Sequence, residues 1–206
     1  MLRSRSSYLL CALLVFASRP AAGENLLAAG QFDQPSDIDG WTITAGDGEA
    51  SLYFQPSPDE GDCFDSGSAL LVTSAPGPRA VQYSICSGNL VGGEMYAVGL
   101  EVYFPDGAGE GWLYWGLTWF DQPDCTGNEL GTIWVGPAGY VPEWQALEFW
   151  SSTEPAVASA RVELSVTSFA APDPLYLDID RVFVRPVRDI FADGFELGQT
   201  CRWHTQ

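Results

Sequence analysis

The sequence predicts an all-β protein, a β-sandwich jelly roll of about nine antiparallel strands. Polar and apolar residues alternate in short segments that are dense in aromatic and β-branched side chains. Gly, Pro and Asp separate these segments, as they do in turns between strands. The chain of 206 residues shows no convincing helical period, and its length suits one domain once a leader is removed.

Residues 1–23 are typical of a secretory signal peptide. Arg3 and Arg5 form a basic start, residues 8–17 are an apolar run too short to span a bilayer, and residues 21–23 are small enough for cleavage. The alternative is a buried N-terminal helix. No later segment of the sequence has the pattern of a membrane helix. We therefore expect a secreted protein, extracellular or periplasmic, without membrane insertion.

The composition is strongly acidic: the formal net charge is −18, and the chain contains no lysine. Such a surface repels phosphate backbones and anionic lipids, which argues against nucleic acid as a partner. Acidic clusters of this kind either bind calcium or keep a protein soluble.

Cysteine usage fits an exported protein. Outside the leader the cysteines are Cys63, Cys86, Cys125 and Cys201, an even number that predicts two disulfides with three possible pairings. If the strands alternate up and down, Cys63, Cys86 and Cys125 fall at the same end of the sandwich. This favours Cys86–Cys125 and leaves Cys63 to pair with Cys201.

The N-terminal half is predicted to contain short strands separated by polar loops. Residues 25–27 form an edge strand, residues 30–40 a loop, and Trp41 begins the next strand. Further strands follow at 49–55, 69–73 and 80–86. The turn-rich residues between the last two predict a hairpin.

The C-terminal half alternates more clearly. In residues 96–104 the apolar set is Tyr96, Val98, Leu100, Val102 and Phe104, which predicts the core face. Residues 112–120 carry aromatic side chains on both faces. The more continuous apolar face places Leu113, Trp115, Leu117 and Trp119 inside and Trp112 and Tyr114 outside. The remaining strands are 132–135, 143–150, 160–168 and 175–186.

The last stretch, 187–206, does not alternate and is read as a tail following the domain at 24–186. It resembles the Asp-Gly-Phe-Glu-Ser-Gly tails of other secreted bacterial proteins. A processing or surface-retention signal is one interpretation, and a tail pinned by Cys201 is the other.

Catalysis has little support in the sequence. The only histidine, His204, lies three residues from the end, which argues against a nucleophile-plus-base enzyme. Paired carboxylates could serve a glycoside hydrolase if Glu101, Glu148 and Glu163 share one outward face. The alternative is that these are solvated strand positions.

Outward aromatic residues offer a stronger lead. Flat faces of sugars stack on aromatic rings, while acidic and amide side chains accept hydrogen bonds from the hydroxyls. We predict a ligand-binding platform with Glu101 and Glu148 as acceptors, because outward rings in this number are unusual without a partner. Its aromatic members are Tyr103, Trp112, Tyr114, Trp144 and Trp150. The alternative places some of these rings under loops or at the rim of the core.

Five short motifs follow one another across residues 24–186. They are Asn25-Leu26-Leu27, Gly30-x-Phe32-Asp33, Gly40-Trp41, Glu143-Trp144-Gln145 and Tyr176-x-x-Ile179-Asp180-x-Val182. Together they resemble the cellulose- and xylan-binding (CenC-like) carbohydrate-binding module family, a jelly roll of the galactose-binding-like type.

The resemblance also implies a structural calcium ion that joins the N-terminal loop to the last strand. The matching positions are Asp33 and Asp180. Where the family often has a second aspartate, this chain has Arg181, which could supply a charge pair in place of metal. Asp37 and Asp39 are either loop caps or further ligands.

The function that we predict is non-catalytic binding of a polysaccharide or glycan by aromatic stacking. The second hypothesis is a structural or adhesive surface protein without sugar binding, and the third is a glycoside hydrolase. The sequence does not predict an oligomeric state.

Overall fold

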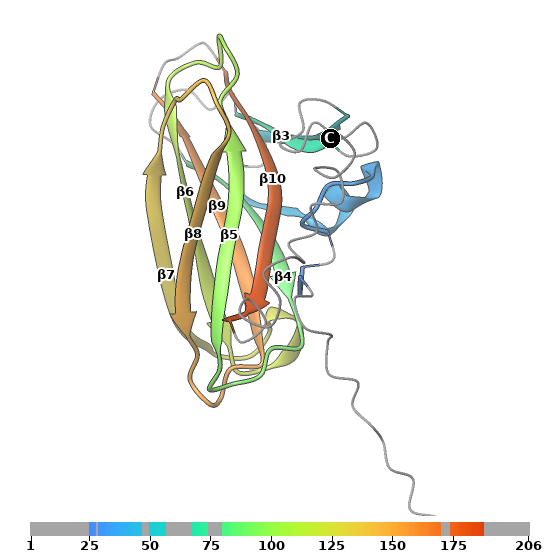
Figure 1. Ribbon diagram of the computed structural model, residues 1–206, viewed down its shortest axis with the longest axis vertical. Coiled ribbons are helices and arrows are strands. Elements are labelled where there is room, and N and C mark those ends of the chain that lie inside the picture. The colour runs from blue at the N-terminus through green and yellow to red at the C-terminus, as the bar shows by residue number, and fades with distance from the viewer. Residues whose placement is uncertain are drawn as a thin grey trace, which may run out of the picture.

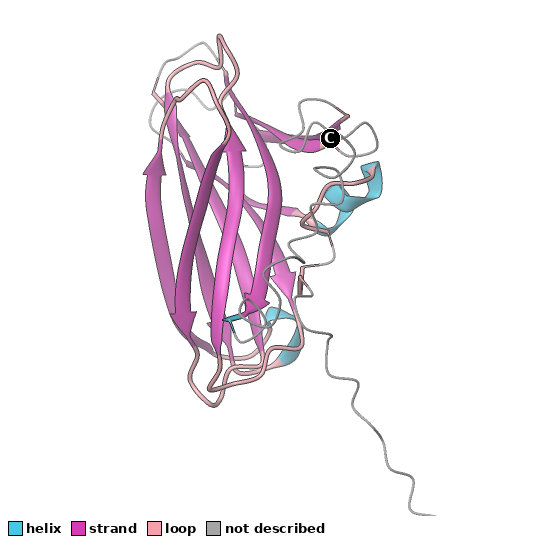
Figure 2. Cartoon of the chain, viewed as in Figure 1, coloured by secondary structure: helices cyan, strands magenta, loops and turns pink. Residues whose placement is uncertain are grey.

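The computed structural model describes residues 25–27, 29–46, 50–56, 67–73, 80–169 and 174–187. They form two antiparallel sheets of five strands packed face to face, so the predicted all-β jelly roll is confirmed, with ten strands rather than about nine. In Figure 1, β5, β8 and β10 lie in front of β6 and β9, and Figure 2 shows that strands dominate. The predicted leader, nearly all of the tail, Cys63 and Cys201 lie outside the described residues. Within the part of the chain that is described, no helix could cross a membrane.

The first sheet, called sheet A, has the strand order β1-β4-β9-β6-β7. Its strands are β1 (Thr42–Ala45), β4 (Ala80–Ser87), β9 (Ser159–Ser168), β6 (Gly111–Phe120) and β7 (Glu129–Ala138). The second sheet, called sheet B, has the order β2-β3-β10-β5-β8. Its strands are β2 (Ala50–Gln55), β3 (Ser68–Thr73), β10 (Leu175–Pro186), β5 (Met95–Tyr103) and β8 (Gln145–Ser152). Short 3-10 helices η1 (Pro35–Gly40) and η3 (Pro123–Cys125) interrupt the loops.

The core lies between the sheets and is built by strict alternation along the strands. Both inward faces predicted for β5 and β6 are correct, since the two sets of side chains are 6% exposed or less. Tyr83 on β4 crosses the core and donates its hydroxyl to the carbonyl oxygens of Ser51 and Val72, at 3.1 and 3.0 Å. Burial raises the pKa of this phenol well above its usual range, so the tie between the sheets stays neutral.

Two local predictions for the N-terminal half are wrong. β3 and β4 do not form a hairpin: β3 pairs with β2 and β10, while β4 pairs with β1 and β9 in the other sheet. Turn residues between two strands indicate a change of direction but not whether the chain also changes sheets. Residues 25–27 are not a strand, and the predicted loop 30–40 ends in η1.

Hydrogen bonds of the Asn25 side chain and of the backbone attach the N-terminal segment to β10 without a regular strand. The Asn25 carboxamide accepts from the backbone N–H groups of Leu27 and Val184 and donates to the carbonyl of Val182 at 2.8 Å. The Val182 N–H donates in turn to the Gly30 carbonyl at 2.8 Å. One asparagine therefore satisfies a stretch of backbone that would otherwise lie unpaired at the sheet.

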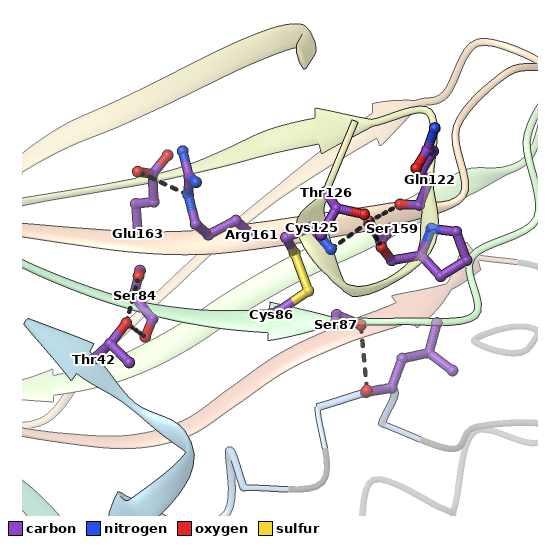
Figure 3. Close-up of a disulfide and its surroundings, with 12 residues drawn as sticks. Thr42, Ser84, Cys86, Ser87, Gln122, Cys125, Thr126, Ser159, Arg161 and Glu163 are labelled. Atoms are coloured by element: carbon purple, nitrogen blue, oxygen red, sulfur yellow. Dashed lines mark hydrogen bonds and ion pairs between the residues drawn. A yellow bond between two sulfur atoms is a disulfide. The ribbon is translucent and has the colours of Figure 1, made fainter. Parts of the chain in front are cut away.

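A disulfide joins Cys86, at the end of β4, to Cys125 in η3, with the Cα atoms 5.9 Å apart (Figure 3). This is the pairing that strand alternation favoured. The loop is held a second time, since the Cys125 N–H donates to Ser159 Oγ at 3.0 Å and that hydroxyl donates to the Gln122 carbonyl at 2.6 Å.

We expect the double substitution Cys86→Ser and Cys125→Ser to lower the free energy of unfolding. The cross-link spans 39 residues. Opening a loop of that size lowers the free energy of unfolding by about 2–4 kcal/mol, because the unfolded chain gains conformational freedom. Urea denaturation of oxidised wild type and variant, without reductant, measures the difference. Coincident transitions with equal slopes would contradict the prediction.

Candidate functional site

Each sheet has one face turned away from the core, and these are called the sheet A face and the sheet B face. The predicted platform is wrong as a single surface, because its members divide between the two. Trp112 and Tyr114 lie on the sheet A face, since β6 belongs to that sheet. The sheet B face carries the other predicted residues: Glu101, Tyr103, Trp144, Glu148 and Trp150. Glu163 lies on the sheet A face, so the three glutamates do not share a surface.

A continuous row of residues, polar on β1, β4 and β9 and called the polar row, crosses the sheet A face. Strand register places Thr42, Ser84, Glu163, Gly116 and Trp134 side by side on β1, β4, β9, β6 and β7. Opposite residues on one face of an antiparallel sheet lie within direct contact distance. The row therefore runs from hydroxyls through a carboxylate to an indole ring.

Gly116 allows the indole of Trp134 to lie over the sheet. A β-carbon at Gly116 would lie 2.3 Å from the Ile133 carbonyl oxygen and 3.0 Å from two ring atoms of Trp134, so a larger residue would displace both the neighbouring strand and the ring. The indole keeps 43% of its surface exposed. Sequence reasoning did not include Trp134 among the outward rings. The available signal was its position in residues 132–135, two positions from Thr132 on the same outward face.

More rings continue the surface along β6. The Trp112 ring packs edge-on against Phe169 at 4.6 Å and lies 6.3 Å from the Tyr114 ring. Trp112 and Phe169 are 41% and 42% exposed. Trp112, Tyr114 and Trp134 thus form an aromatic border beside the polar row.

Glu163 is the only carboxylate in the polar row, and it is held rigidly. Thr118 Oγ1 donates to its Oε2 at 2.6 Å, and Arg161 Nε lies 3.3 Å from its Oε1. Figure 3 shows Arg161 and Glu163 side by side near the disulfide. Arg161 also reaches Glu129 at 3.4 Å and covers the Phe120 ring at 5.0 Å. The carboxylate is thus oriented and partly neutralised, which suits an acceptor of hydrogen bonds.

Charge pairs and a bulge organise the sheet B face. The register of β10 shifts between Asp180 and Phe183, and Arg181 adopts a left-handed φ of 49° there. The bulge directs the Arg181 guanidinium to Glu101, at 3.0 Å. Glu101 is therefore already engaged in an ion pair rather than presented as a free acceptor.

The remaining predicted residues of this face form two groups. Tyr103 and Trp144 pack together with ring centres 5.5 Å apart, and neither is among the most exposed aromatic residues. Glu148 and Trp150 lie further along β8, where the indole Nε1 donates to Glu148 Oε1 at 2.6 Å. Trp150 is 54% exposed.

Asp178 is a buried carboxyl on the sheet B face, between Leu70 and Tyr103 in the register. Burial raises its pKa to about 6, although the hydrogen bond from Ser68 Oγ at 3.2 Å acts in the opposite direction. The side chain is neutral in acid, and it must carry a buried charge above its pKa.

Asp178→Asn should remove a pH dependence of stability. The pKa of Asp178 is higher in the folded than in the unfolded protein, so its contribution to the free energy of unfolding is fully present below the unfolded pKa of about 4. This contribution is lost as the pH rises through the folded pKa of about 6. The loss amounts to at most roughly 3 kcal/mol. The stability of the variant relative to wild type should therefore increase between pH 4 and pH 7. Denaturant unfolding at each pH measures this.

Asp121→Asn is the matched control for this pH series. Hydrogen bonds from Asn128 lower the pKa of Asp121, so its contribution is lost as the pH falls rather than as it rises. A pH-independent difference between wild type and Asp178→Asn would refute the assignment.

The residues matched to the calcium site are placed differently from one another. Asp33 is exposed, whereas Asp180 is buried and accepts the Arg181 N–H at 2.7 Å. Asp37 caps η1, since its carboxylate accepts the Gln34 N–H at 3.1 Å. Among the residues that the structure describes, no group of three or more acidic, His or Cys side chains could hold a metal ion. This finding does not concern an ion held by two carboxylates and backbone carbonyls, and calcium stays a prediction.

Comparison with known proteins shows what the fold resembles. No protein-family model matches the sequence, and no curated protein matches it. Among solved structures, the enzymatically active domain of tailspike protein 4 from bacteriophage CBA120 matches at TM-score 0.62 and 16% identity, over 79% of this chain and 21% of that one. The arabinose-bound α-L-arabinofuranosidase MgGH51 matches at TM-score 0.58 and 16% identity, over 80% of this chain and 27% of that one.

A third structure is a separate domain that is matched over almost its whole length. The CBM22-1 xylan-binding domain of Paenibacillus barcinonensis Xyn10C matches at TM-score 0.55 and 17% identity, over 82% of this chain and 98% of that domain. The chain spans only about a fifth to a quarter of the first two structures. The chain therefore has the jelly-roll fold of carbohydrate-binding modules, which also occurs as a part of larger proteins.

Proposed function

We propose that this protein is an exported, non-catalytic module that binds a neutral polysaccharide on its sheet A face. The observation that carries the proposal is the polar row Thr42–Ser84–Glu163–Gly116–Trp134 beside the rings of Trp112 and Tyr114. Xylan binding by a domain of the same fold supports it.

Physical chemistry connects this arrangement to sugars. Each pyranose ring has a flat C–H face that packs on an aromatic ring and hydroxyls that need hydrogen-bond partners. The sheet A face supplies both at neighbouring positions. Exposed rings such as Trp134 offer the stacking surface, and the exposed hydroxyl of Thr42, held 3.1 Å from that of the buried Ser84, offers a donor or acceptor. Such sites work by shape and hydrogen bonding, without bond cleavage.

The arrangement of glutamates favours binding over hydrolysis. A glycoside hydrolase needs two carboxyl groups flanking one bond, one of them protonated as an acid. Glu163 is ion-paired on one sheet face, whereas Glu101 and Glu148 lie on the opposite face and each faces an arginine. Release of reducing ends from xylan or galactan by the purified protein would overturn the non-catalytic assignment.

Trp134→Ala should weaken polysaccharide binding by about 1–3 kcal/mol, by analogy with the stacking of bases on aromatic side chains. The fold should remain intact, because the indole is 43% exposed and lies outside the core. Affinity electrophoresis on xylan, galactan and other neutral polysaccharides measures binding, and thermal unfolding measures folding. Tyr53→Ala is the matched control, since this ring is 53% exposed on the other sheet.

The possible results separate the hypotheses. Loss of binding in Trp134→Ala but not in Tyr53→Ala supports the sheet A face. No binding of any polysaccharide by folded wild type would favour a structural or adhesive protein instead. An equal loss of thermal stability in Trp134→Ala would show that the ring belongs to the packing of the fold.

The proposed calcium tie between Asp33 and Asp180 has its own test. If the ion joins the N-terminal segment to β10, chelation should lower the melting temperature, because an ion that binds only the folded state stabilises it. If the Asn25 hydrogen bonds are sufficient, melting curves with excess calcium and with chelator should coincide. Asn25→Ala should lower the melting temperature in both conditions.

A further inference from the structure

A second group of side chains, on the sheet B face, has the chemistry of a separate sugar site. We propose that Trp150, Glu148, Arg185 and Phe183, called the β8–β10 cluster, bind a second glycan chain, so that one domain bridges two chains. The inference rests on the proposed glycan-binding function. It concerns the opposite side of the sandwich.

Small residues on β5 bring this cluster together. Ala97 lies between Trp150 and Arg185 in the register, and Gly99 lies between Glu148 and Phe183. A β-carbon at Gly99 would come within 2.4 Å of the Phe183 ring, which therefore leans over the glycine. Side chains from β8 and β10 can thus approach one another across the strand between them.

Arg185 has hydrogen-bonding capacity that its neighbours do not use. Its guanidinium covers the Phe183 ring at 4.2 Å, and its Nη2 lies 3.9 Å from Glu148 Oε2, beyond hydrogen-bond distance. The Nε donor is buried and has no acceptor among the described residues. Leaving such a donor unsatisfied is costly, so a rotation of the Arg185 side chain that brings Nε to a ligand hydroxyl gains this energy on binding.

The other members supply the complementary parts of a sugar site. The Trp150 indole is 54% exposed and is oriented by its hydrogen bond to Glu148 Oε1. It offers a flat stacking surface whose position is set before binding. Glu148 accepts hydrogen bonds and Arg185 donates them, which matches a pair of neighbouring hydroxyls.

Local charge indicates the class of ligand. The chain carries a net charge of −18, but in this cluster a carboxylate faces a guanidinium, so the surface is close to neutral. An anionic glycan would meet the acidic remainder of the protein, and a cationic ligand would meet Arg185. A neutral glycan avoids both electrostatic repulsions.

The test follows the indole N–H signals of Trp150 and Trp134 by ¹⁵N–¹H NMR of the full mature chain, assigned with Trp150→Phe and Trp134→Phe. The saccharide probes are xylohexaose and β-1,4-galactotriose, with titration into wild type and into Trp134→Ala. We expect the Trp150 signal to shift with saturation in both proteins. Arg185→Lys, which keeps the charge but removes the Nε donor, should weaken this response by about fivefold or more.

Bridging is measured separately with immobilised xylan or galactan and the same polysaccharide in fluorescent, soluble form. Wild type should capture the soluble chain, whereas Trp150→Ala should still bind the immobilised one but lose the capture. Tyr53→Ala is the control, because it removes an exposed ring from the opposite edge of the same sheet, about 19 Å away across four strand spacings. It should behave as wild type.

Each outcome has a distinct meaning. If Trp134 responds to a saccharide and Trp150 does not, the second site is refuted while the proposed function stands. If Trp150 alone responds, the β8–β10 cluster binds glycan, but the sheet A site falls and bridging of two chains is refuted. If neither responds, both fail. A Trp150 shift that depends on protein concentration without saccharide would refute the glycan assignment and indicate contact between copies of the chain.

Discussion

Burial of the inward faces of β5 and β6 is the constraint on which the rest of the structure depends. A strand places alternate side chains on opposite faces, so every buried residue determines where its neighbours point. With Val98 and Leu100 in the core, Ala97 and Gly99 must lie on the sheet B face. With Trp115 in the core, Gly116 must lie on the sheet A face. The hydrophobic effect that packs the two sheets together therefore also determines which side chains lie on the outer faces.

Glycine residues then determine where aromatic rings can lie on the two outer faces. Gly116 and Gly99 each lie in a middle strand of a sheet, and a large ring from a neighbouring strand leans over each of them, Trp134 in one case and Phe183 in the other. Glycine weakens a strand by its conformational freedom and by lack of a side chain. Here the cost is offset by ring contact with the sheet, which holds aromatic side chains in a defined orientation on a solvent-facing surface.

The sequence was sufficient for most of the strands and for the direction of most side chains, but not for the edge strand expected at 25–27 or for assigning strands to sheets. Alternation is local, and so the inward faces of β5 and β6 were predictable. Sheet membership depends on long-range pairing, which alternation does not encode. This explains why Tyr103 and Tyr114 were placed on one platform although they lie on opposite sides of the sandwich. It also explains the wrong hairpin and the omission of Trp134, which comes to lie beside Gly116 only when β7 pairs with β6.

The distribution of arginine gives the two faces a common character. The described arginines are Arg161, Arg181 and Arg185, and each lies within 4 Å of a glutamate carboxylate on an outer sheet face. In a chain with so large a negative charge, unpaired carboxylates could have filled these positions. Pairing keeps the centres of both faces close to neutral and leaves the acidic excess elsewhere. A surface of this kind loses little by desolvation when an uncharged polyhydroxyl chain covers it, because its ion pairs remain intact and its rings gain contact. The same arrangement disfavours polyanions. They would find the described arginines already paired with glutamates, and the negative charge of the whole protein would repel them.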